Sequence, residues 1–172
     1  MKCPPPGSED GTIWVLDAST SEAIVGLFTR HTYYINYVTF LPDRQHIMSA
    51  LNNRTILVWD SAIGEVVVGL FTGHSNMVRS VVFLPDRQCI TLASFDHMIH
   101  VWDVTTGKVV AGPFTGHTDV VRSVAFLPDR GHIASGSIDC TICVWDAITG
   151  KVIVGPFVGH TDIIYSVAFS PN

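Results

Sequence analysis

The chain has 172 residues, 47% of them apolar, and a formal net charge of −5. It carries no basic stripe of the kind that nucleic-acid-binding proteins show, so we expect no nucleic-acid partner. No apolar run approaches the roughly 20 residues that a membrane-spanning helix needs, so we expect no membrane partner either.

The predicted elements are short apolar strands separated by turns that contain Gly, Pro and Asp. Near the N-terminus we expect strands at residues 12–16 and 23–28, preceded by a run of prolines at 4–6. The clearest stretch carries four strand-like segments, at 120–126, 132–137, 141–145 and 151–157. A last strand is predicted at 163–169. Because no segment shows helical periodicity, the sequence predicts an all-β fold.

A repeat of 43 residues runs through the chain. Trp-Asp pairs begin at Trp59, Trp102 and Trp145, and histidines recur with the same spacing at 31, 74, 117 and 160. The tetrapeptide LPDR recurs in step at 41, 84 and 127. A period in the low forties with Gly-His and Trp-Asp landmarks is typical of WD40 blades, so the chain resembles the WD40 β-propeller family from end to end. The sequence motif G-P-F-x-G-H-T-D followed by S-V-A-F is also similar to the WD arrays of fungal NACHT-type receptor proteins, although no NACHT P-loop is present.

The resemblance implies a WD40 β-propeller segment of about four blades, each a small antiparallel sheet. We expect a single repeat domain over residues 1–172. Its parts are a partial blade at 1–31, complete blades at 32–74, 75–117 and 118–160, and the inner strand of a blade shared by the two termini at 161–172. Proline has no backbone N–H, so the prolines at 4–6 predict that the second strand of the shared blade is missing. We expect an open or partial propeller whose uncovered blade faces make it prone to self-association. The alternative is half of a larger two-fold ring, in which the strand at 163–169 joins the blade at 12–16 of a second copy.

WD40 blades often hold a buried hydrogen-bond tetrad of His, Ser or Thr, Asp and Trp, whose polar atoms satisfy one another. By this resemblance, the third complete blade has all four members, His117, Ser135, Asp139 and Trp145. The second has His74, Asp96 and Trp102, with Leu92 in the place of Ser. The first has His31, Ser49 and Trp59, with Asn53 in the place of Asp. We therefore expect the blades to differ in stability.

Ser, His and Asp together also allow a hydrolase interpretation, which stays open as an alternative. Against it, the pattern recurs from blade to blade, and no G-x-S-x-G motif accompanies it. Cys140 and Cys143 form a C-x-x-C, but residues three apart on a strand point to opposite faces, which does not favour a metal site. We expect no catalytic residue, no cofactor and no metal.

The resemblance further implies a partner-binding face at the loops that lead into each inner strand. The residues that it indicates most strongly are Arg79, Phe95, Arg122, Tyr165, Tyr34 and Met77. Aromatic residues, Met and Arg are enriched at the cores of protein interfaces. The sequence is therefore interpreted as a non-catalytic scaffold that binds proteins or peptides. The competing interpretation is a truncated or degenerate propeller fragment with no partner of its own.

The expected location is the cytoplasm or the nucleus. The chain begins MKCPPPG, without the apolar segment of a secretory signal. Its four cysteines then indicate reduced thiols rather than disulfides.

Overall fold

The computed structural model describes residues 2–3, 12–17, 19–20, 23–25, 34–69, 71, 73–84, 88–129 and 131–170. All elements assigned in these ranges are β-strands, which confirms the predicted fold class. In the same ranges no helix is long and apolar enough to cross a membrane. The chain divides into two compact units, residues 1–72 and 73–172.

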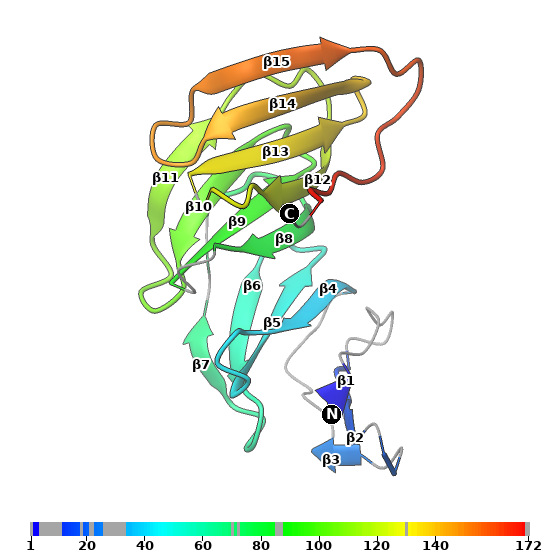
Figure 1. Ribbon diagram of the computed structural model, residues 1–172. Helices are drawn as coiled ribbons and strands as arrows, with labels where there is room; N and C mark the ends of the chain where they lie inside the picture. The colour runs from blue at the N-terminus through cyan, green and yellow to red at the C-terminus, as the bar shows by residue number, and fades with distance from the viewer. Residues whose placement is uncertain are drawn as a thin grey trace. The chain divides into compact units, whose positions relative to one another are not determined.

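The second unit contains two four-stranded antiparallel sheets, and the strands of each sheet pair in chain order (Figure 1). The second blade consists of β8 (Val78–Phe83), β9 (Cys89–Ser94), β10 (Ile99–Asp103) and β11 (Val109–Phe114). The third blade consists of β12 (Val121–Phe126), β13 (His132–Ser137), β14 (Thr141–Asp146) and β15 (Val152–Val158). Each strand of the third blade begins and ends within one residue of its predicted bounds.

The first unit contains one complete blade and a smaller sheet. The first blade consists of β4 (Ile35–Phe40), β5 (His46–Leu51), β6 (Ile56–Asp60) and β7 (Val66–Gly69). The N-terminal sheet consists of β1 (Lys2–Cys3), β2 (Val15–Asp17) and β3 (Ala23–Val25), in that order. The prediction that this sheet lacks a second strand is therefore wrong in part, because β1 pairs with β2 just before the proline run. Residues 4–6 themselves lie outside the described residues.

The Trp-Asp pair has two separate structural roles, which explains why it marks each repeat. Trp59, Trp102 and Trp145 are at most 1% exposed and lie in the cores of their units. The neighbouring aspartate faces the following turn, as at Asp103, whose carboxylate accepts hydrogen bonds from the backbone N–H and the hydroxyl of Thr106 at 2.7 and 2.8 Å. The repeat therefore fixes a buried anchor and the start of a turn with two adjacent residues.

The segment after β15 corrects a second prediction, since residues 163–169 form no strand. The segment, red in Figure 1, returns beside the third blade. The Val167 N–H donates to Ser123 Oγ at 3.1 Å, just as the Val124 N–H donates to Ser80 Oγ at 3.3 Å one repeat earlier. The segment thus occupies the position of the next inner strand. It lacks a ladder because a strand requires a second strand to pair with, and the described part of the second unit offers none there.

Candidate functional site

Each blade has one end at which the loop into the inner strand meets the turn between its second and third strands. In the third blade this end holds His117 and the turn Ile138–Cys140, and in the second it holds His74 and the turn Phe95–His97. We call it the His–Asp end. The opposite end carries the LPDR residues 41–44 of the first blade and 127–129 of the third, and is called the LPDR end.

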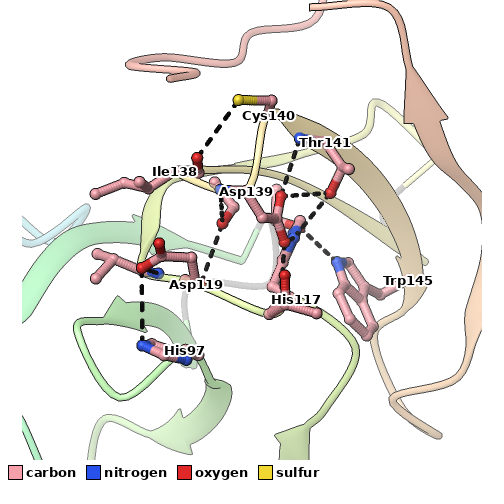
Figure 2. Close-up of polar contacts among 12 residues, drawn as sticks. His97, His117, Asp119, Ile138, Asp139, Cys140, Thr141 and Trp145 are labelled. Carbon is pink, nitrogen blue, oxygen red and sulfur yellow. Dashed lines mark hydrogen bonds and ion pairs between the residues drawn. The ribbon is translucent and has the colours of Figure 1, made fainter. Parts of the chain in front are cut away.

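In the third blade, a chain of hydrogen bonds links the four tetrad residues, of which Figure 2 labels His117, Asp139 and Trp145. The indole N–H of Trp145 donates to Ser135 Oγ at 2.7 Å, and Ser135 Oγ lies 2.6 Å from Nε2 of His117. Nδ1 of His117 lies 2.9 Å from Oδ2 of Asp139. A neutral imidazole with its proton on Nδ1 satisfies all three contacts at once, because Ser135 can then donate to Nε2.

The carboxylate of Asp139 holds the turn against the loop. It accepts hydrogen bonds from the hydroxyl of Thr141 at 2.6 Å and from the backbone N–H groups of Thr118 and Thr141 at 2.9 Å each. Burial raises the pKa of Asp139, but the hydrogen bonds from Thr141, Thr118 and His117 outweigh it and lower the pKa to about 2. The group is therefore charged at neutral pH. It supports the left-handed backbone of Cys140, at φ 67°, in the turn that it closes.

The second blade keeps only part of this network. Nδ1 of His74 lies 2.8 Å from Oδ2 of Asp96, but Leu92 stands where the third blade has its serine. As a result, Nε2 of His74 and the indole N–H of Trp102 are buried without a hydrogen-bond partner. The ring of His100 packs against both, with centroids 4.7 Å from His74 and 5.1 Å from Trp102, and neither of its own nitrogens has a partner.

His100 was not among the site residues that the sequence indicated, but its surroundings in the structure change its pKa. Burial, together with the nearby imidazole of His74, lowers the pKa of His100 from 6.5 to about 4, although Asp96 acts in the opposite direction. The repeat did contain a signal, because the same position holds Leu57 and Cys143 in the other blades. His97 lies in the turn before β10, with φ 70°.

In the first blade, the indole N–H of Trp59 donates to Ser49 Oγ at 2.9 Å. Asn53 accepts from the backbone N–H of Thr55 at 3.2 Å, so it caps the turn as the aspartates do in the other blades. His31 lies outside the described residues.

Ser135, His117 and Asp139 are hydrogen-bonded in the same order as in a serine hydrolase, but a substrate cannot reach the serine. Ser135 is 0% exposed, and its oxygen already accepts from Trp145. A nucleophile must reach the substrate carbonyl, and this hydroxyl is enclosed by its own blade. The arrangement is therefore suited to holding the blade together.

The residues that the sequence indicated for partner contact lie at the His–Asp end. In the second unit, the Phe95 N–H donates to the Met77 carbonyl at 2.9 Å, so the backbones of these two residues meet where the loop and the turn join. Arg79 is exposed, and Tyr165 is 66% exposed. The guanidinium of Arg122 stands 4.7 Å from the centre of the Tyr165 ring, in a cation–π contact.

Two further contacts belong to this end of the blades. In the first unit, Tyr34 is 54% exposed, and its carbonyl accepts from the Asn52 N–H at 3.0 Å. In the second unit, Nε2 of His97 lies 3.9 Å from Oδ1 of Asp119, which joins the turn of one blade to the loop of the next (Figure 2).

Comparison with known proteins gives a family and a fold. The family described as "WD domain, G-beta repeat" matches residues 23–60, 65–103 and 108–146. Among solved structures, the chain is similar to the crystal structure of the computationally designed Ika8 protein, with a TM-score of 0.81 and 26% sequence identity. The match covers 96% of this chain and 49% of that one, so this chain spans about half the length of the designed protein. No curated protein matches the sequence.

Proposed function

The chain belongs to the WD40 repeat family, and on that premise we propose that it is a non-catalytic scaffold that binds a protein or peptide at the His–Asp end. WD40 repeat proteins in general serve as interaction scaffolds. The observation that carries the proposal is the group of Arg79, Phe95, Arg122 and Tyr165 at this end of the second unit. We call these four residues the Arg–aromatic patch.

The composition of the Arg–aromatic patch supports binding. Arginine and tyrosine are the residue types that most often dominate interface energies, because they combine apolar area with directed hydrogen bonds. Tyr165 already stacks with Arg122, so less side-chain freedom remains to be lost when a partner covers the pair. Arg79 occupies the same repeat position as Arg122 and is exposed. The two guanidinium groups suit a partner segment that offers carboxylates or backbone carbonyls next to an apolar side chain.

Two other functions are less well supported. A hydrolase would require Ser135 to meet a substrate, and this serine is 0% exposed. A degenerate fragment without a partner would explain the incomplete network around Leu92. It would not explain why two Arg and two aromatic residues, of which Arg79 and Tyr165 are exposed, lie at one end of the second unit.

The proposal includes a reducing compartment, the cytoplasm or the nucleus. Cys140 and Cys143 are free thiols, which agrees with such a compartment. Cys143 is 3% exposed within the core, where burial raises its pKa and keeps the thiol protonated.

The test uses peptides selected by display against the folded chain. For the tightest peptide, Arg79→Ala or Phe95→Ala should weaken binding by roughly 10-fold, as measured by calorimetry, because these residues would be interface anchors. Lys108→Ala is the matched control, since Lys108 is an exposed cation of the same blade near the LPDR end. If both patch variants bind as well as the parent and Lys108→Ala binds more weakly, the binding surface lies at the LPDR end and the proposal is wrong. If display enriches no peptide, the result favours the interpretation as a fragment without a partner.

A further inference from the structure

The repeat gives every blade two faces that differ in kind. We call the face toward the preceding repeat the upstream face, and the face toward the following repeat the downstream face. In the second unit, the downstream face of the second blade packs on the upstream face of the third, and both belong to one buried cluster. Phe114 stacks on Trp145 at 6.0 Å between ring centres. Gly150 completes the fit, because a Cβ there would lie 2.3 Å from Phe114.

The downstream face of the third blade is only partly covered. Phe157 stands at the repeat position of Phe114, yet it is 50% exposed while Phe114 is 2% exposed. Ile142 and Val144 are likewise partly exposed, whereas the equivalent Ile99 and Val101 are at most 2% exposed. The C-terminal segment covers only part of this face, where Ile164 packs over Gly136.

The outer strand of the third blade, β15, is also uncovered. All seven residues of β15 are exposed, among them Val152, Ile153 and Val154 at 40%, 49% and 45%. Contiguous apolar surface of this kind marks an interaction site, and an unpaired edge strand adds to it.

The N-terminal sheet is uncovered on its opposite face. Ile13 and Val15 are 0% exposed and join a core with Ile35, Ile47 and Trp59, so the downstream face of this sheet is buried within the first unit. The alternate residues Trp14 and Leu16 point the other way and are 41% and 38% exposed.

Leu16 identifies this uncovered surface by its place in the repeat. It stands where the other blades have Trp59, Trp102 and Trp145, none of which is more than 1% exposed. By repeat position, the upstream face of the N-terminal sheet therefore corresponds to the face of the third blade that the second blade covers.

We propose that this chain binds a second copy of itself head to tail, with the downstream face of the third blade in one copy on the upstream face of the N-terminal sheet in the other. By repeat position, these two faces correspond to the two faces that meet between the second and third blades. Phe157 would lie against Leu16 of the second copy as Phe114 lies against Trp145. The faces are different, so the contact is heterologous, and it either closes into a ring or extends.

A second copy fits these faces better than an unrelated partner does. Both faces are built for a blade of this same repeat. The designed protein that matches 96% of this chain does so with 49% of its own length, so a fold of this type extends over about two such chain lengths. This contact is distinct from the Arg–aromatic patch and does not depend on the function proposed for it.

The test uses the whole chain and two single variants, Phe157→Glu and Trp14→Glu, each of which spoils one face. Light scattering coupled to size exclusion should show the parent as a species larger than 18.8 kDa, and each variant as a monomer of 18.8 kDa. Both substituted side chains are about half exposed, so the folds should survive, which circular dichroism checks. Ile148→Glu is the control off both faces, because Ile148 is 83% exposed in a turn at the LPDR end. This control should assemble like the parent.

The decisive step is to mix the two variants at the highest soluble concentration. Each retains the face that the other has lost, so a head-to-tail contact predicts a mixed species at twice 18.8 kDa. A contact between identical faces predicts no such rescue and would leave one of the single variants assembled. A monomeric parent, single variants that still assemble, or a mixture that stays monomeric would each overturn the proposal.

Discussion

The hydroxyl of Ser135 should contribute more to stability than its size suggests. It lies between Trp145 Nε1 at 2.7 Å and His117 Nε2 at 2.6 Å, and it is 0% exposed. Ser135→Ala removes one atom and leaves two buried polar groups without partners. Each such group costs about 1–3 kcal/mol. Because the side chains around a small void can relax in part, we expect the free energy of unfolding to fall by about 2–4 kcal/mol.

Urea unfolding followed by circular dichroism measures this change, with Ser166→Ala as the matched control. Ser166 is exposed, so its substitution should change the free energy of unfolding by less than about 0.5 kcal/mol. In a Trp145→Phe background the indole N–H is already gone, and Ser135→Ala should then cost about 1 kcal/mol less. A loss for Ser135→Ala that is no larger than that of the Ser166 control would refute the reasoning that the network stabilises the blade.

Three further outcomes follow from the same contacts. Hydrogen exchange should be slower at 131–146 than at 88–103, because only the third blade has a complete tetrad; the opposite order would contradict this. His100→Leu should reduce the loss of stability at acid pH. Burial lowers the pKa of His100 to about 4, so the free energy of unfolding that depends on its neutral form is fully present above pH 6.5 and is lost as the pH falls toward 4. A variant whose stability to urea falls with pH as steeply as that of the parent would argue against this. Gly150→Ala should lower the melting temperature, because Gly150 has φ 67° and a Cβ would lie 2.3 Å from Phe114; an unchanged melting temperature would show that the two blades can separate locally.

Much of the fold could be predicted because the repeat carries redundant information. Three copies of one pattern placed the strands of the third blade within one residue, and the Trp-Asp spacing identified the buried tryptophans. Strand formation at 163–169 could not be predicted in this way. Whether an apolar segment joins a ladder depends on a partner strand, which the segment itself does not specify.

The candidate site was predictable in part for a related reason. The sequence showed that Leu92 interrupts the tetrad of the second blade. It did not show that His100 would meet the two groups left unpaired, because that contact depends on how two side chains of β10 pack against the loop that leads into β8. His100 fills a repeat position that is apolar in the other blades, so the repeat position of a residue indicates its burial better than its residue type does.

We propose that the chain binds a protein or peptide through the His–Asp end. Hydrogen exchange of the chain with and without a saturating display-selected peptide is the most direct test, because one experiment measures both ends of each blade. Exchange should be slower in the presence of peptide at residues 76–80, 94–98 and 119–123, and unchanged at 103–108 and 127–129 near the LPDR end. Slower exchange confined to the LPDR end would contradict it.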